Sequence, residues 1–111
     1  MCVLRHRDLR LTQLGSAVTH AEVGAALIRA GLDRGALTQV AMQVHVEPFT
    51  VTDADTAAAL IADGARLGLS LGDRACLALA GRLRVQALTA ERAWAQLEAG
   101  IEITLIRHAQ A

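Results

Sequence analysis

Apolar positions along the chain follow two different spacings, and each spacing predicts a type of secondary structure. Residues 70–83 place Ala75, Leu79 and Leu83 on one helical face, and residues 19–31 show the same spacing before a terminating glycine. Further helices are predicted over residues 33–44, 52–68 and 90–100. Short runs of apolar residues predict strands over 15–18, 44–49, 85–89 and 101–106.

The order of these elements predicts the fold class. Strands that alternate with helices of ten to fifteen residues are typical of right-handed crossovers and of a parallel sheet covered by helices. We therefore expect an α/β fold with a parallel sheet. In such folds ligands bind outside the carboxyl ends of the strands, where the helices begin.

Hydroxyl and acidic residues occur together at four of the predicted helix starts. The pairs are Thr19 with Glu22, Thr52 with Asp55, Ser70 with Asp73, and Thr89 with Glu91. Each pair can act simply as a helix cap, because the hydroxyl and the acid satisfy backbone N–H groups and the acid faces the positive end of the helix dipole.

A second interpretation concerns the acids as a group. If the sheet is parallel, several of them converge on its carboxyl edge, where carboxylates repel each other unless a cation neutralises them. Oxygen ligands of this kind suit Mg²⁺ or Mn²⁺. Such a metal can activate water and stabilise charge on a phosphoryl oxygen.

Composition narrows the classes of protein to consider. The 111 residues predict one domain, and a hydrophobic content of 53% argues against disorder. The net charge is zero, yet all eleven basic residues are arginine, which suits phosphate contacts as well as solvated surfaces. Cys2 and Cys76 lack zinc-ligand spacing, so reduced thiols in a cytoplasmic protein are expected. No run has the length of a membrane span, and no signal peptide is predicted.

Two linked segments carry a resemblance to a known family. "SLGDRACLALA" and "LTAERAW", followed by "IEITLIR" and preceded by "SAVTHAEVGAALIRAG", resemble the PIN-domain ribonucleases, in particular the VapC-type toxins of toxin–antitoxin pairs. The order and spacing match over about residues 14–107, which leaves 1–13 as an atypical N-terminal segment and 108–111 as a tail.

The resemblance implies a site and an activity. By position, Glu22, Asp73 and Glu91 would be the catalytic acids and the ligands of Mg²⁺ or Mn²⁺, with Ser70 and Thr89 as hydroxyls behind them. The substrate would be RNA and a partner would be the cognate antitoxin, while a homodimer stays open and no membrane association is expected. Asp55 has no counterpart in the family, so we interpret it as a cap.

The chain departs from the family at two places. Glu91 stands where the family usually has Asp, which moves a ligand oxygen outward by about one C–C bond. The family also opens with a central strand that ends in Asp, whereas Asp8 is the only acid before Glu22. We therefore expect a PIN-like sheet without the usual first strand and following helices, like that of an N-terminally shortened PIN domain.

Three hypotheses follow. In the first, the chain is a metal-dependent endoribonuclease, whether or not the missing acid impairs its activity. In the second, it is an inactive PIN remnant that keeps the fold and an antitoxin-binding surface. In the third, it is a small α/β scaffold whose acids are only caps. Two further predictions concern single side chains. Trp94 is expected in the core, and Arg74 and Arg92 are expected to contact nearby acids or RNA phosphate.

Overall fold

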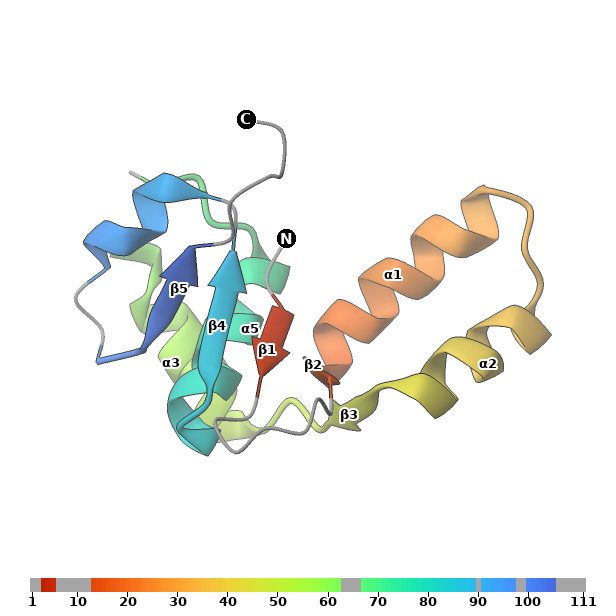
Figure 1. The fold of residues 1–111 in the computed structure, drawn as a ribbon, viewed down its shortest axis with the longest axis horizontal. Coiled ribbons are helices and arrows are strands. Elements are labelled where there is room, and N and C mark those ends of the chain that lie inside the picture. Colours follow the sequence, from red (N-terminus) through yellow and green to blue (C-terminus); the bar gives the residue numbers. More distant parts are fainter. Residues whose placement is uncertain (1–2, 6–12, 63–66, 90, 98–99, 106–111) are drawn as a thin grey trace.

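Among the residues that the structure describes, the sheet has five short strands. A computed structural model describes residues 3–5, 13–62, 67–89, 91–97 and 100–105. The strands are β1 (Val3–Arg5), β2 (Gln13–Ser16), β3 (His45–Glu47), β4 (Gln86–Thr89) and β5 (Ile103–Leu105), in the spatial order β3-β2-β1-β4-β5 (Figure 1). The predicted 108–111 tail, Asp8 and most of the 1–13 segment lie outside the described residues.

The direction of the strands differs in part from the prediction. β2 pairs with β3 and β4 pairs with β5 in parallel, as expected for an α/β fold. β1 lies between these pairs and runs antiparallel to both, with Leu4 opposite Leu14 on one side and opposite Ala87 on the other. The centre of the sheet, where we expected the usual first strand to be missing, is thus filled by a strand that is antiparallel and ends in Arg5 rather than in Asp. Since β2 and β4 both oppose β1, their carboxyl ends lie at the same edge.

Four α-helices and one short 3-10 helix are described. They are α1 (Ala17–Arg29), α2 (Arg34–Gln43), α3 (Val51–Ala59), α5 (Leu71–Leu83) and the 3-10 helix η1 (Arg92–Gln96). α5 matches the predicted helix closely. The predicted helix over residues 90–100 is wrong in type, since only a five-residue 3-10 helix forms there among the described residues.

Helix caps confirm one of the predicted hydroxyl–acid pairs and correct two others. Ser70 and Asp73 form a reciprocal capping box at the start of α5. At α1 the cap is Ser16 rather than Thr19, and α1 has no acid in its first turn. At α3 the capping box joins Thr50 and Asp53 and not Thr52 and Asp55. Local sequence permits either box at α3, so a contact elsewhere in the fold decides between them.

That contact is an ion pair between α3 and α5. The Arg82 guanidinium donates through Nε to Asp53 Oδ1 at 2.8 Å and through Nη2 to Oδ2 at 3.1 Å. Asp53 is only 2% exposed, so its charge depends on this bidentate partner. One helical turn from the start of α5, Arg74 donates through Nη1 to the Ala57 carbonyl at 2.9 Å. The two arginines thus fix α3 along α5.

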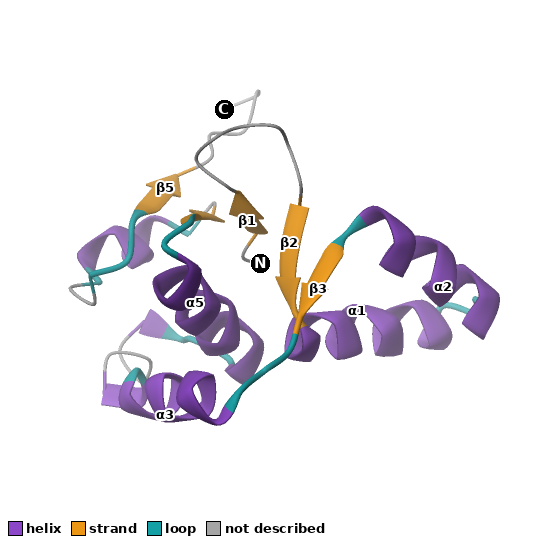
Figure 2. Ribbon diagram, turned by 90° about the horizontal axis from the view of Figure 1, so that it is seen from below, coloured by secondary structure: helices purple, strands orange, loops and turns teal. Residues whose placement is uncertain are grey.

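The core lies between α5 and the sheet. Figure 2 shows α5 beneath the central strands, with α3 on the side of α5 away from the sheet. Every α5 residue from Ala75 to Ala80 is buried, which two-sided coverage by the sheet and α3 explains. Leu4 from β1 and Trp94 from η1 complete this core. The prediction that Trp94 is a core residue is confirmed, since it is 2% exposed.

The first two helices form a hairpin that extends from the β3 side of the sheet (Figures 1 and 2). Gly24 of α1 faces the Leu37 side chain of α2. No residue of α1 is fully buried, and the helix reaches the main body where it contacts β2 and α5. The N-terminal half of α1 is therefore the part that can bring a side chain to α5.

The structure bears on two predictions that were made from composition, the state of the cysteines and the absence of a membrane span. Cys76 is disulfide-bonded, so the expectation of reduced thiols was wrong. A cytoplasmic location loses that support and stays a prediction. Within the described ranges, no helix combines the length and the apolar character that crossing a membrane requires.

Candidate functional site at the carboxyl edge of the sheet

Two buried hydroxyls mark the carboxyl edge. Ser16 ends β2 and Thr89 ends β4, and each is 1% exposed. The Ser16 hydroxyl accepts a hydrogen bond from the Val18 N–H at 3.1 Å and so starts α1. The Thr89 hydroxyl accepts one from the Glu91 N–H at 3.0 Å. These hydroxyls fix the directions in which the chain leaves both strands, and the predicted role of Thr89 as a supporting group agrees with this placement.

Asp73 is held at the start of α5 by its capping box. Its Oδ2 accepts from the Ser70 N–H at 3.0 Å, and the Asp73 N–H donates to the Ser70 hydroxyl at 3.1 Å. Oδ1 accepts no hydrogen bond from any residue that the structure describes. One carboxylate oxygen therefore serves the helix, while the other is open to a further ligand.

Glu22 reaches the same helix turn from α1. Its carboxylate lies directly against Gly72, the residue before Asp73, where a Cβ on Gly72 would be 3.0 Å from Oε2 and 2.7 Å from Cδ and would overlap Oε1. Within the described part of the chain, the Glu22 carboxylate has no hydrogen bond or ion pair. The structure therefore brings Glu22 and the first turn of α5 together.

Glu91 does not join them. It is an exposed residue with extended backbone at the start of η1, and its side chain makes no capping hydrogen bond. Among the described residues, which include all three predicted acids, no group of three His, Cys, Asp or Glu side chains is arranged to hold a metal ion. The arrangement is thus a pair of acids near α5 with Glu91 apart from that pair.

Three other acids of the described residues have different surroundings. Glu47 ends β3, and its Oε1 lies 2.8 Å from His45 Nε2. Asp55 is exposed on α3 and does not cap the helix, so its interpretation as a cap was wrong. Asp53 is satisfied by Arg82 and Thr50. Burial alone raises the pKa of Asp53, but the hydrogen bonds from Arg82 and Thr50 and the Arg82 charge outweigh it and lower that pKa below its usual range.

The two arginines predicted to lie near the acids, Arg74 and Arg92, have different surroundings. The Arg74 guanidinium donates a hydrogen bond to the Ala57 carbonyl and therefore lies against α3. Arg92 is exposed in η1, close in sequence to Glu91. Of the two arginines predicted to contact acids or RNA phosphate, Arg92 is the one whose exposure leaves it accessible to RNA.

Two contacts of α5 could not be predicted from the local sequence. Gly72 seats the Glu22 carboxylate, but its only sequence signal was a glycine in the first turn of a predicted helix. The Asp53–Arg82 pair joins residues 29 positions apart, and no local pattern specifies such a contact.

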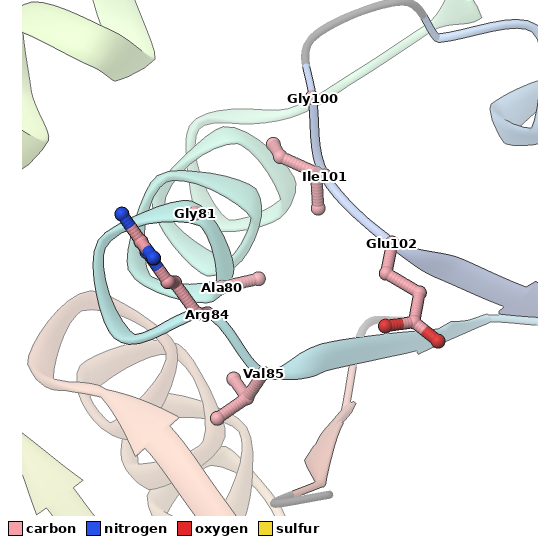
Figure 3. A pocket seen from close by; sticks show the side chains of 7 residues that line it. All are labelled: Ala80, Gly81, Arg84, Val85, Gly100, Ile101 and Glu102. Carbon is pink, nitrogen blue, oxygen red and sulfur yellow. The ribbon is translucent and has the colours of Figure 1, made fainter.

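A pocket lies at the opposite edge of the sheet. Its volume is about 420 Å³, and it is bounded by the end of α5, by Val85 before β4 and by residues 100–102 before β5 (Figure 3). In Figure 3 the Arg84 and Glu102 side chains extend on different sides of it. Glu22, Asp73 and Glu91 do not line this pocket, so it is separate from the candidate site.

Comparisons with known proteins give no relative for this chain: no family model, no curated protein and no solved structure matches it. The fold and the residues of the candidate site therefore carry the functional argument.

Proposed function

We propose that the chain is a PIN-like protein that hydrolyses RNA phosphodiesters with a divalent cation, Mg²⁺ or Mn²⁺, held by Glu22 and Asp73. The observation that carries this proposal is the placement of the Glu22 carboxylate over Gly72, next to Asp73. The two acids come from segments 51 residues apart in sequence, and both belong to the motifs that resemble the VapC-type toxins.

The donor set is compatible with such a cation. Mg²⁺ keeps several water ligands and is commonly bound by one or two carboxylates together with substrate phosphates, so Glu22 and Asp73 can supply the protein's share of its ligands. Asp73 Oδ1 and both Glu22 oxygens make no hydrogen bond to the described residues, and carboxylate oxygens are the ligands that these ions prefer. When bound, the cation would supply positive charge that stabilises the negative charge developing on the phosphoryl oxygens during hydrolysis.

The protein's own groups have distinct roles in this proposal. Glu22 and Asp73 bind the cation, and the Ser70 cap holds the Asp73 carboxylate at a fixed point of α5. Thr89 holds the backbone at Glu91, an exposed acid that lies apart from Glu22 and Asp73 and that can orient water or RNA in this proposal. The exposed Arg92 beside it can contact the RNA backbone, because a guanidinium binds phosphate oxygens in pairs.

Cleavage of RNA tests this proposal directly. Wild-type protein, Asp73→Asn and Asp55→Asn are incubated with a mixed panel of structured and single-stranded RNAs, with Mg²⁺ or with a chelator. We expect cleavage by the wild type and by Asp55→Asn only with Mg²⁺, and a loss of at least about 10-fold in Asp73→Asn. Asp55 is the matched control because it is an exposed acid on α3, outside the pair. Cleavage that persists unchanged in Asp73→Asn would contradict the proposal.

One observation favours a second candidate, an inactive PIN remnant that keeps an antitoxin-binding surface. Glu91 is not gathered with Glu22 and Asp73, so among the described residues the site has two acids where the family has about four. This candidate predicts that the wild type leaves the whole RNA panel uncut while it still binds metal. Binding of an antitoxin encoded next to this protein's gene, measured by calorimetry, would support it.

A further inference from the structure

Gly72 lies within α5, where a glycine lowers helix stability and where the backbone conformation does not require one. Glycine within a helix destabilises it by comparison with alanine, because it loses more backbone freedom on folding. The described glycines with positive φ are Gly31, Gly68 and Gly100, so Gly72 does not need the left-handed region. What distinguishes Gly72 is that the Glu22 carboxylate fills the place of its missing side chain.

We infer that Gly72 is a positioning residue: its lack of a side chain lets the Glu22 carboxylate lie against the first turn of α5, beside Asp73. Gly72 itself contacts no ligand in this scheme and acts only through Glu22. The consequence for metal binding rests on the proposed function, whereas the seating of the carboxylate does not. The contact also joins α1 to α5 near the start of the α1–α2 hairpin.

Adding a methyl group at position 72 should lower the metal affinity without unfolding the protein. In Gly72→Ala the new Cβ would meet the Glu22 carboxylate at distances that real Cβ atoms do not tolerate, so the carboxylate has to move. Glu22 is exposed and flexible, which means that it can swing into solvent with little strain. The variant therefore keeps its fold and loses the proximity of the two acids.

The same helix offers a matched control. Gly81 is exposed in α5, and a Cβ there would lie 3.6 Å from Ile101 Cγ1, an ordinary contact. Gly81→Ala therefore makes the same chemical change in the same helix without touching Glu22. Both alanine variants should unfold at or above the wild-type temperature, because alanine favours the helix.

Metal affinity is measured by calorimetric titration with Mn²⁺ of the wild type, Gly72→Ala and Gly81→Ala under non-reducing conditions. We expect Gly72→Ala to bind about 10-fold more weakly, the order of loss seen when groups that orient metal ligands are removed. Gly81→Ala should bind like the wild type. Equal affinities of the wild type and Gly72→Ala would overturn the inference.

A metal-free measurement keeps this inference separate from the proposed function. In a double-mutant cycle, the gain in unfolding free energy from Gly72→Ala is measured with Glu22 present and again in Glu22→Ala. We expect a larger gain in Glu22→Ala, because no carboxylate then has to be displaced, and the same gain in both backgrounds for Gly81→Ala. Equal gains for Gly72→Ala would overturn the inference even if metal binds. Unequal gains in a protein that binds no Mn²⁺ would support the seating of Glu22 and refute the proposed function.

Discussion

The Asp53–Arg82 pair gives the sharpest prediction about what holds α3 in place. Asp53 is 2% exposed, and its two carboxylate oxygens receive both Arg82 hydrogen bonds and that of the Thr50 N–H. In Arg82→Gln the buried carboxylate loses its charged partner. Removal of one member of a buried ion pair typically costs 3–5 kcal/mol, whereas exposed pairs contribute about 1 kcal/mol or less.

The magnitude expected here lies at the low end of the buried range. The Arg82 side chain is 30% exposed, so water reaches part of the pair and screens it. We therefore expect Arg82→Gln to lose about 3 kcal/mol of unfolding free energy, which corresponds to a fall in Tm of roughly 10–20 °C for a domain of this size.

Thermal and urea unfolding followed by circular dichroism, with the Cys76 disulfide intact, measure this loss. Arg34→Gln is the control, since Arg34 is exposed in the first turn of α2 and its substitution should change stability by less than about 0.5 kcal/mol. Asp53→Asn combined with Arg82→Gln should recover part of the loss, because no unpaired charge then stays buried. If Arg82→Gln is no less stable than Arg34→Gln, the account of α3 as fixed by this pair is refuted.

Three further predictions test other parts of the fold. The pKa of Asp53 is lowered in the folded state, so its contribution to stability is present above the unfolded pKa and is lost as the pH falls through the folded pKa. As the pH falls below about 4, Asp53→Asn should therefore lose less unfolding free energy than the wild type. Thr50→Ala should cost about 1 kcal/mol in urea unfolding through loss of the α3 cap, and Thr52→Ala much less; the reverse order would support the box at Thr52. Leu4→Ala should cost about 2–5 kcal/mol in the same assay, and a cost under 1 kcal/mol would mean that β1 is not part of the core.

The helix α5 shows what local sequence can predict. Its apolar face, its Ser70 cap and Asp73 three residues later are all short-range signals, and the structure has each of them where it was expected. The strand β4 that follows is likewise defined by a local apolar run. These elements carry Asp73 and Thr89, so that part of the candidate site could be placed from the sequence.

The starts of α1 and α3 show where local signals are insufficient. Ser16 and Thr19 are both hydroxyl residues able to cap α1, and the pairing of β2 with β3, which ends at Ser16, favours the earlier one. At α3, Thr50 with Asp53 and Thr52 with Asp55 are equally good boxes on paper, and the distant Arg82 selects the first. Where two local choices are equivalent, a tertiary contact decides.

The centre of the sheet could not be predicted because it depends on long-range pairing. The apolar residues Cys2 to Leu4 are compatible with a short strand, but they do not indicate that Leu4 is buried, 1% exposed, between β2 and β4. Its antiparallel direction means that no residue of β1 extends an acid from a carboxyl end toward Glu22 and Asp73. Val3–Arg5 contains no acid and Glu91 lies apart from the pair, so the site rests on two acids among the described residues.

Binding of Mn²⁺ to the apoprotein tests the central claim most directly. Calorimetric titrations compare the wild type with Glu22→Gln, which removes one charge of the acid pair, and with Asp55→Asn, which removes an exposed charge elsewhere. The account predicts saturable binding at millimolar metal or below for the wild type and Asp55→Asn, with at least about 10-fold weaker binding for Glu22→Gln. A wild type that binds no Mn²⁺ at millimolar concentration, or a Glu22→Gln variant that binds as tightly as the wild type, would contradict it.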